Sequence, residues 1–571
     1  MLKRIICQVA CLFSAAAVTA AVFFVSQAPI DKPAQAVSTA GSYIVQADSL
    51  ATARQAVQSV GGEITHELGI ISAVGAMLSA EQRSRLGADK RLRIHVDRNA
   101  TVAGTGPSTF YPTLAGAAEL HASGNDGDGV TVAILDSGYW EKGEVSKDPS
   151  GVRRVLAQYD AIAGRTVRAE EEGKQRSTDD NGHGSHLTSI ILSSKRDVNR
   201  DFAGVAPGVN LVTVKAFDDR GNGTYLNVIR GLDWILNNHA TYGIRVLNLS
   251  FSAPPRSHYW DDPINQAVMK LWQQGIVVVA SAGNKGPGAM TIGVPGNVPY
   301  VITVGAMSDY GTPYFPEDDR LTSFSSAGPT VEGFVKPDVI APGGRIIGLM
   351  DDEDHKIAQD HPEFLFEFHD SDKYFEMSGT SQSAAIVSGV VALVLQAEPN
   401  LTPDQVKCKL VSSARPAVAP DGGLAYSVFQ QGAGMVNAQA AVNGSNYDCA
   451  NRGMDINLDL TGQVHYGGRA NVDEADNYYI MGLEGYMWTD GYMWTDGYLW
   501  TDGYLWTDGY LWTDGYLWTD GTVGANGYLW TDGYVWTDGY MWTDSYMWTD
   551  GYIWTNSLTE SASINAWVDQ E

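Results

Sequence analysis

One serine in this chain opens a segment that has no polar side. Ser381 follows Gly379-Thr380 and precedes a run from Ser383 to Leu395 in which nearly every residue is small or apolar. A helix without a polar stripe belongs in a protein core. Its first turn would place the Ser381 hydroxyl beside unpaired backbone N–H groups, at the positive end of the helix dipole. Alone, the segment fits either a catalytic nucleophile or a buried serine bonded to its own helix.

Two further polar signals supply what a serine nucleophile needs. Asp136 ends the apolar run Thr131 to Leu135, and His183 lies in Asp180-Asn181-Gly182-His183. Acyl transfer by serine requires an imidazole to take the hydroxyl proton and a carboxylate to orient that imidazole. The order Asp, His, Ser is one of the known orders of such a triad. Asn284 could add a side-chain N–H₂ donor for the oxyanion.

The elements that would position these residues form a βαβ series. Short, β-branched, apolar runs are typical of strands in a covered parallel sheet. They alternate with candidate helices at Thr224 to Asn238 and Pro263 to Gln274. We therefore predict an α/β domain with a doubly wound, mostly parallel sheet and helices on both faces, whose catalytic groups collect at the carboxyl ends of the strands. The predicted strands are residues 131–135, 211–214, 245–249, 276–280 and 301–304.

Together these motifs resemble those of the subtilisin-like serine peptidases, the subtilase family, over roughly Tyr111 to Val442. The resemblance implies that Ser381 is the nucleophile and His183 the general base and then acid. It implies that Asp136 orients His183 and that Asn284 lies in the oxyanion hole. It also implies protein or peptide substrates and a secreted endopeptidase that needs no cofactor for its chemistry. The residues that would bind the substrate side chain before the cleaved bond are Ser250, Phe251, Ser252, Gly283 and Gly293.

The chain departs from the family pattern close to the chemistry. Gln382 stands where many members carry Met, and Ser252 stands where a glycine often lines the substrate groove, so the depth of the pocket is open. His186 is expected to be a packed histidine rather than a second base. Calcium sites are common in the family, but the acidic cluster Asp351–Asp354 lacks a recognisable ligand spacing. Structural calcium therefore cannot be assigned, and no metal ligand is predicted.

The chain outside the peptidase region divides by composition. Lys3 and Arg4 precede an uncharged run, Ile5 to Val25, and small residues that favour a secretory signal peptide; an uncleaved membrane anchor is the alternative. A small α+β unit, Ser42 to Val102, resembles the inhibitory propeptide of the family, which would make the chain a self-processed zymogen. The predicted parts are a signal peptide (1–36), a propeptide (42–105), a peptidase domain (106–447), a linker (448–484), repeats (485–556) and a C-terminal end (557–571).

The cysteine content bears on a disulfide, and the charge distribution bears on the class of binding partner. Only Cys408 and Cys449 lie beyond the leader; one disulfide and two buried thiols are both compatible with their spacing. The net charge of −28 is concentrated in the tail, because no Lys or Arg occurs after Arg469. Such a balance argues against a nucleic-acid partner.

The tail repeats the hexapeptide Gly-Tyr-x-Trp-Thr-Asp from Gly485 to Asn556. Each unit places Asp-Gly between short aromatic runs, a pattern that favours hairpins, so we predict short β-strands or a β-solenoid. Tyr and Trp offer large stacking surfaces. The tail is therefore either an adhesive face for carbohydrate or cell envelope, which would attach the enzyme to a cell surface, or a spacer.

Two other functions are compatible with parts of the sequence. The chain could be a subtilase-fold binding or adhesion protein with vestigial proteolysis, but the complete set of catalytic residues argues against this. Ester or lipid hydrolysis is disfavoured because the sequence around Ser381 has no G-x-S-x-G elbow.

Overall fold

The computed structural model describes residues 41–97, 109–167, 177–197, 200–313, 318–350, 355–367, 373–419, 423–473, 477–481, 561–564, 567–568 and 570. The chain forms two compact units, Met1–Val102 and Ala103–Glu571. The predicted signal peptide, the cluster Asp351–Asp354 and the predicted repeat solenoid lie outside the described residues.

The first unit is a four-stranded antiparallel sheet with two helices. Its strand order is β2-β3-β1-β4, and its small core includes Val45, Val57 and Val74. β2 was not predicted from the sequence, because this strand is largely exposed and its residues carry little apolar pattern. The elements are β1 (Gly41–Gln46), α1 (Leu50–Ser59), β2 (Glu63–Leu68), η1 (Gly69–Ile71), β3 (Ala73–Leu78), α2 (Ala80–Gly87) and β4 (Arg93–Val96).

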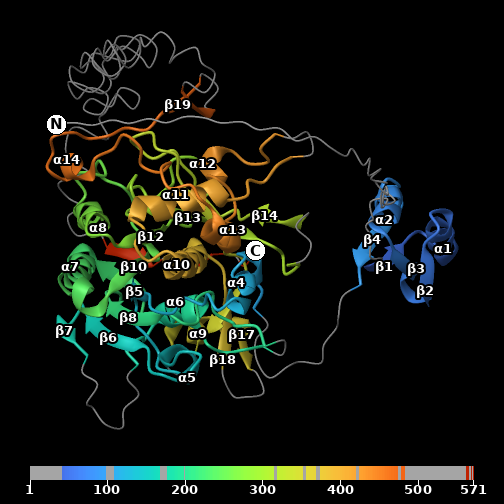
Figure 1. The fold of residues 1–571 in the computed structure, drawn as a ribbon, viewed down its shortest axis with the longest axis horizontal. Helices are drawn as coiled ribbons and strands as arrows, with labels where there is room; N and C mark the ends of the chain where they lie inside the picture. Colours follow the sequence, from blue (N-terminus) through green and yellow to red (C-terminus); the bar gives the residue numbers. More distant parts are fainter. Residues whose placement is uncertain are drawn as a thin grey trace, which may run out of the picture. The chain divides into compact units, whose positions relative to one another are not determined.

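A nine-stranded sheet organises the described part of the second unit (Figure 1). Neighbouring strands run parallel, except where the short β14 and β7 pair antiparallel at the edges. All five predicted strands are present, and the predicted fold class is confirmed. The order across the sheet is β14 (Arg320–Leu321), β13 (Ile302–Ser308), β12 (Val277–Ser281), β10 (Ile244–Leu249), β5 (Thr131–Asp136), β8 (Asn210–Lys215), β6 (Val155–Asp160) and β7 (Arg165–Thr166), with β15 (Val339–Pro342) also paired to β13.

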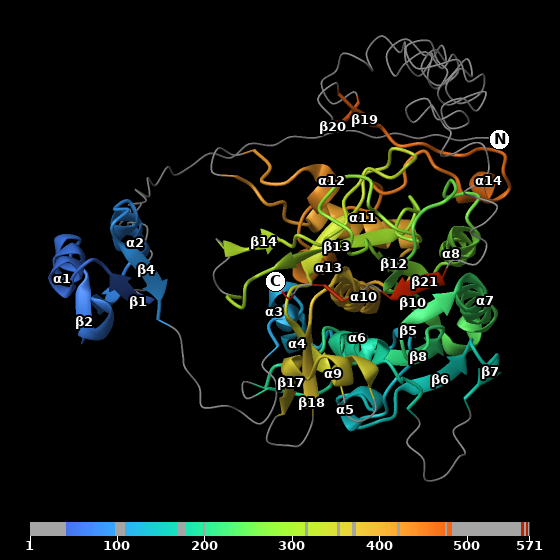
Figure 2. The same ribbon diagram turned by 180° about the vertical axis from the view of Figure 1, so that it is seen from behind.

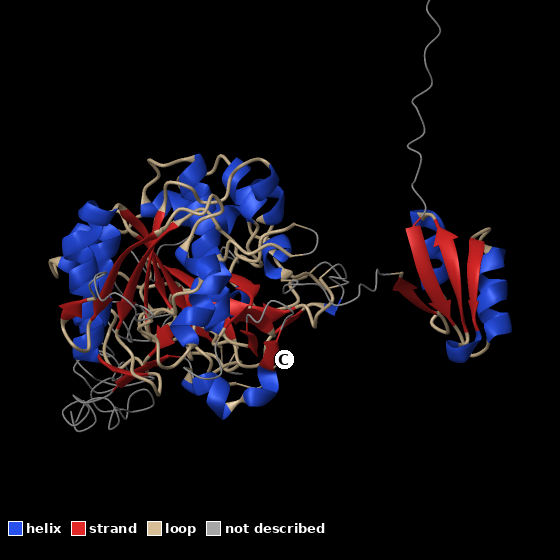
Figure 3. Ribbon diagram, turned by 90° about the horizontal axis from the view of Figure 1, so that it is seen from below, coloured by secondary structure: helices blue, strands red, loops and turns tan. Residues whose placement is uncertain are grey.

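Helices cover both faces of this sheet (Figure 3). On one face, α7 (Tyr225–Tyr242) packs on β5 and β10, and α8 (Pro263–Gln273) packs on β12. On the other face lie α6 (His183–Leu192) and α10 (Thr380–Ala397), which also contact each other. Every residue of α10 from Thr380 to Leu395 is buried. This helix is long and apolar enough to cross a membrane, but its burial makes it the central core helix that its sequence predicts.

Shorter elements complete the second unit. They are α3 (Tyr111–Leu114), α4 (Ala118–Ala122), α5 (Gly143–Ser146), β9 (Asn222–Thr224), β11 (Phe251–Ser252), β16 (Ile346–Leu349), α9 (Lys356–Asp360), η3 (Pro362–Phe364), β17 (Leu365–Glu367), β18 (Lys373–Met377), α11 (Pro403–Ser413), α12 (Val428–Gln431), α13 (Ala438–Asn443) and β21 (Ser561–Ile564).

The segment expected to be a linker differs from that expectation. It carries α14 (Ile456–Leu460), β19 (Ala470–Val472) and β20 (Tyr478–Ile480). The buried carboxylate of Asp459 accepts hydrogen bonds from the hydroxyls of Tyr259 at 2.6 Å and Tyr300 at 2.9 Å. A disulfide joins Cys408 to Cys449, which settles the open choice between paired and free thiols. The beginning of this segment is therefore folded onto the second unit.

Candidate active site

The carboxylate and the imidazole come from adjoining ends of β5 and α6. Asp136 closes β5 at its carboxyl end, and His183 is the first residue of α6. Asp136 Oδ1 lies 2.8 Å from His183 Nδ1, and both side chains are buried. The two elements can approach this closely because Gly184 lacks a side chain: a Cβ there would lie 2.4 Å from the carbonyl oxygen of Gly138. The predicted pair is thus in hydrogen-bonding contact.

Asp179 stabilises the turn that leads into His183. This role of Asp179 was not predicted from the sequence. Its Oδ1 accepts from the backbone N–H groups of Asn181 and Gly182 at 3.0 and 2.9 Å. Its Oδ2 accepts from the N–H and the hydroxyl of Ser185 at 2.8 and 2.6 Å. Burial alone would raise the pKa of Asp179, but nearby His355 and these hydrogen bonds outweigh burial and lower it. The sequence offers two adjacent aspartates before His183, and only the folded turn shows that Asp179 is the one that accepts these hydrogen bonds.

Ser381 lies in the first turn of α10 and is hydrogen-bonded to Ser250, the residue that follows β10. Its hydroxyl donates to the carbonyl oxygen of Ser250 at 3.2 Å, and the Ser250 hydroxyl donates to the Ser381 carbonyl oxygen at 3.1 Å. The Ser381 side chain reaches the cavity that His183 also lines. Two strand ends and two helix starts therefore meet at one edge of the sheet, as predicted for a parallel sheet.

Asn284 is held in one orientation by Thr380. The Asn284 Oδ1 accepts from the backbone N–H of Thr380 at 3.0 Å and from its hydroxyl at 2.8 Å. The amide nitrogen lies on the other side of this group, 3.2 Å from the position that a Cβ of Gly379 would occupy. The missing side chain of Gly379 therefore leaves space beside the amide donor, where an oxyanion would have to approach.

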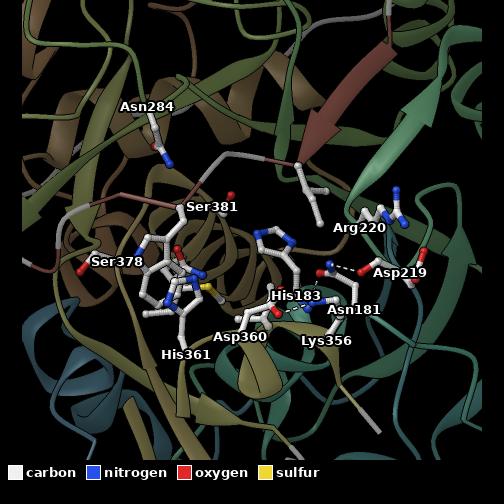
Figure 4. A pocket seen from close by; sticks show the side chains of 15 residues that line it. Asn181, His183, Asp219, Arg220, Asn284, Lys356, Asp360, His361, Ser378 and Ser381 are labelled. Carbon is white, nitrogen blue, oxygen red and sulfur yellow. Dashed lines mark hydrogen bonds and ion pairs between the residues drawn. The ribbon is translucent and has the colours of Figure 1, made fainter. Parts of the chain in front are cut away.

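These side chains border a cavity of about 510 Å³ (Figure 4). His183, Ser381 and Asn284 line it, while Asp136 is not among its lining residues. Gln382 lines it too, together with two residues from the C-terminal end that the sequence analysis did not place there, Ile564 and Trp567. Nothing in the sequence around these two residues signalled a site, since they follow the repeats and match no catalytic motif.

The five predicted substrate-binding residues are not among the lining residues of this cavity. Phe251 and Ser252 form β11, which pairs with β21. The hydroxyl of Ser252 lies 2.0 Å from where a Cβ of Gly293 would be and 3.1 Å from where a Cβ of Gly283 would be. The Ser252 side chain therefore fills the space between the two glycines that were expected to border the pocket.

His186 is buried and does not line the catalytic cavity. It is fully buried, and burial lowers its pKa to about 3. Its Nε2 is hydrogen-bonded to the carbonyl oxygen of Phe375 at 3.0 Å, and Gln382 Nε2 lies 3.5 Å from its Nδ1. His186 is therefore a neutral, packed histidine, and Gln382 connects it to the cavity wall.

The arrangement contains the parts that acyl transfer needs: a hydroxyl, an imidazole bonded to a carboxylate, and an oriented amide donor. Among the described residues, no group of three or more His, Cys, Asp or Glu side chains is gathered as a metal site would require.

Several known proteins are similar to this chain in sequence or in fold. The family model described as the subtilase family matches residues 127–434. Serine protease AprX of Bacillus subtilis is 36% identical over 323 residues, covering 56% of this chain and 67% of that protein. Subtilisin DY of Bacillus licheniformis is 30% identical over 325 residues, covering 57% and 94%. The crystal structure of fervidolysin from Fervidobacterium pennivorans, a keratinolytic enzyme related to subtilisin, aligns with a TM-score of 0.45 at 23% identity, covering 72% of this chain and 62% of that one. The range matched by the family model contains Asp136, His183, Asn284 and Ser381.

Proposed function

This chain belongs to the subtilase family of serine peptidases, and we propose that it is a secreted endopeptidase that cleaves proteins through an acyl-enzyme on Ser381. The observation that carries the proposal is the 2.8 Å contact between Asp136 and His183. His183 also lines the cavity that Ser381 and Asn284 line, whereas Asp136 does not.

Each residue has one task in the proposed reaction. Ser381 Oγ attacks the scissile carbonyl carbon while His183 Nε2 takes the hydroxyl proton. Asp136, bonded to Nδ1, fixes the tautomer that leaves Nε2 unprotonated and then stabilises the imidazolium. The Asn284 amide and the Ser381 backbone N–H donate to the oxyanion. His183 next gives its proton to the leaving amine, and a water molecule activated by His183 hydrolyses the ester.

Replacing Asn284 with alanine is expected to lower kcat by about 10²–10³-fold and to change KM little, since the donor acts mainly on the transition state. That range was measured for the corresponding asparagine of a subtilisin. Steady-state kinetics on a chromogenic peptide test it. Asn443→Ala, on the exposed end of α13, is the matched control. A rise in KM without a fall in kcat would assign Asn284 to ground-state binding instead.

Replacing Ser252 with glycine is expected to deepen the pocket, because the Ser252 hydroxyl fills the space beside Gly293. The ratio of kcat/KM for a peptide with Phe before the cleaved bond to that for one with Ala should rise about 10-fold. The exposed Ser445→Gly should leave this ratio unchanged. An unchanged ratio in Ser252→Gly would show that Ser252 does not limit the pocket.

We further propose that the enzyme is exported and made as a zymogen. The charged start and apolar run of residues 1–36 support export. The first unit folds as a compact body of its own, which supports its role as a propeptide that inhibits the enzyme until it is cut off. Intact-mass spectrometry of the secreted protein would locate both processing sites.

The repeats of Gly485 to Asn556 lie outside the described residues, and their adhesive role stays a prediction from the sequence. If they bind carbohydrate or cell envelope, deleting them while keeping residues 557–571 should reduce retention on envelope preparations about 10-fold or more, because stacking of many aromatic rings is lost. The measurement is the fraction of activity pelleted with envelopes. Equal retention of both forms would make the tail a spacer.

A further inference from the structure

Near the C-terminal end of the chain, β21 takes the place between β9 and β11, which is called the groove below. Figure 2 shows β21 beside β10. β21 lies between β9 and β11 and runs antiparallel to both. Ile564 pairs with Phe251, and its backbone N–H donates to the carbonyl oxygen of Gly221 at 3.2 Å. Among the described strands, β21 is the only one that pairs with β9 or β11. Without β21, two strand edges would border an open groove.

That groove is where the proposed function needs its substrate. Unpaired strand edges bind extended peptides through main-chain hydrogen bonds, and β11 consists of two residues predicted to bind substrate, Phe251 and Ser252. At the end of β21, Ile564 lines the cavity together with His183 and Ser381. β21 therefore follows the path that a bound peptide would take toward Ser381.

The groove is fitted to the side chains of β21. Ala562 is fully buried and Ile564 is 6% exposed, and both belong to the main core of the second unit. A Cβ on Gly221 would lie 2.6 Å from Cγ1 of Ile564, so the absence of a side chain at Gly221 is what admits Ile564. Because Ala562 and Ile564 are buried in the core, β21 is packed into the second unit and does not lie loosely on its surface.

Contacts continue along the cavity wall at an aromatic site formed by His361, Phe364 and Phe375, of which His361 lines the cavity together with Trp567. The ring of Trp567 stacks on His361 with centroids 3.8 Å apart and an interplanar angle of 6°. Its centroid lies 5.3 Å from that of Phe364 and 5.9 Å from that of Phe375. Arg345 Nη2 donates to the carbonyl oxygen of Gln570 at 3.3 Å. The C-terminal end therefore contacts the second unit at β21, at Trp567 and at Gln570.

We propose that this C-terminal segment, through β21 and Trp567, is a resident substrate-like ligand that inhibits the full-length enzyme. The inference rests on the proposed peptidase function, because the tail would exclude substrates from the same groove. Since the ligand is tethered in the same chain, its effective concentration is high even where each contact is weak. The aromatic site is then a binding site for a tryptophan side chain.

The test uses four full-length variants and one peptide. Trp567→Ala removes the aromatic anchor, and Ile564→Asp places a charge in the buried part of the groove. Trp554→Ala, in the last repeat, is the matched control for the loss of a tail tryptophan, and Ser381→Ala reports background hydrolysis. Intact mass confirms that the unmodified chain, Trp567→Ala, Ile564→Asp and Trp554→Ala share the same ends, whereas Ser381→Ala is expected to keep the first unit. Cleavage of a chromogenic tetrapeptide is measured for each, and a fluorescein-labelled peptide with the sequence of residues 561–571 is titrated into Ile564→Asp by anisotropy.

We expect Trp567→Ala and Ile564→Asp to raise kcat/KM about 10-fold over the unmodified chain, because the first loses the stacking of Trp567 on His361 and the second puts a charge where Ile564 is buried. Trp554→Ala should match the unmodified chain. The peptide should bind Ile564→Asp and inhibit it competitively, raising KM without changing kcat. Unchanged kcat/KM in both activating variants, with no binding of the peptide, would overturn the inference while leaving the peptidase function intact. Binding of the peptide with no hydrolysis above Ser381→Ala would instead refute the proposed function.

Discussion

Replacing Ser381 with alanine is expected to lower kcat by about 10⁶-fold, the magnitude measured for loss of the nucleophile in a subtilisin. The reason is that no acyl-enzyme can form, whereas the cavity, Asn284 and the substrate groove remain. About 8 kcal/mol of transition-state stabilisation is lost at that ratio. The measurement is hydrolysis of casein and of a chromogenic peptide. Release of the first unit should stop too, since self-processing uses the same serine.

A serine from the same buried helix is the control for this variant. The hydroxyl of Ser383 donates to the carbonyl oxygens of Ala341 and Pro342, so Ser383→Ala also removes a buried hydroxyl from α10. It should retain activity within a few-fold of the unmodified chain. Residual activity above 1% in Ser381→Ala would contradict the assignment of the nucleophile, and continued maturation would contradict self-processing.

Replacing Asp136 with asparagine is expected to lower kcat by about 10⁴-fold, the loss known for the same change in another serine peptidase triad. An amide at this position can donate a hydrogen bond to Nδ1 of His183, which would move the imidazole proton to the nitrogen that must accept one from Ser381. KM should change little, because Asp136 does not line the cavity. The two constants are separated by steady-state kinetics over a range of peptide concentrations.

Asp148→Asn controls for the loss of a hydrogen-bonded carboxylate. Asp148 accepts from the backbone N–H groups of Ser150 and Val152 in an exposed turn, and it takes no part in the cavity. Its activity should equal that of the unmodified chain. A loss of less than 10-fold in Asp136→Asn, with thermal unfolding unchanged, would mean that His183 is oriented by something other than the carboxylate.

The sequence predicted the sheet and its catalytic edge because their causes are local. Buried parallel strands need β-branched, apolar residues on both faces, and this requirement is visible in runs such as Thr131 to Leu135. Polar residues that directly follow such runs, as Asp136 does, are brought together by the parallel topology alone. The contact between His183 and Asp136, which was expected from their motifs, is present in the structure at 2.8 Å.

The parts that were missed depend on tertiary contacts. β2 is an exposed strand, so its residues carry no buried pattern. Asp179 and its neighbour Asp180 are the same residue type, and only the folded turn shows that Asp179 accepts hydrogen bonds from Asn181, Gly182 and Ser185. β21 is formed by Ser561-Ala562-Ser563-Ile564, whose small residues suit a narrow groove but give no signal of one. Its two partners, β9 and β11, are also too short to be seen as strands in the sequence.

The central claim is that Ser381 is an activated nucleophile, and covalent labelling tests it directly. The protein is treated with an organophosphorus fluoridate, in which a serine oxygen displaces fluoride at phosphorus, and the labelled site is located by peptide mass spectrometry. The account predicts one phosphorylated residue per chain, Ser381, with a parallel loss of peptide hydrolysis and no labelling in Ser381→Ala. Complete loss of hydrolysis with the label on a different residue would contradict it.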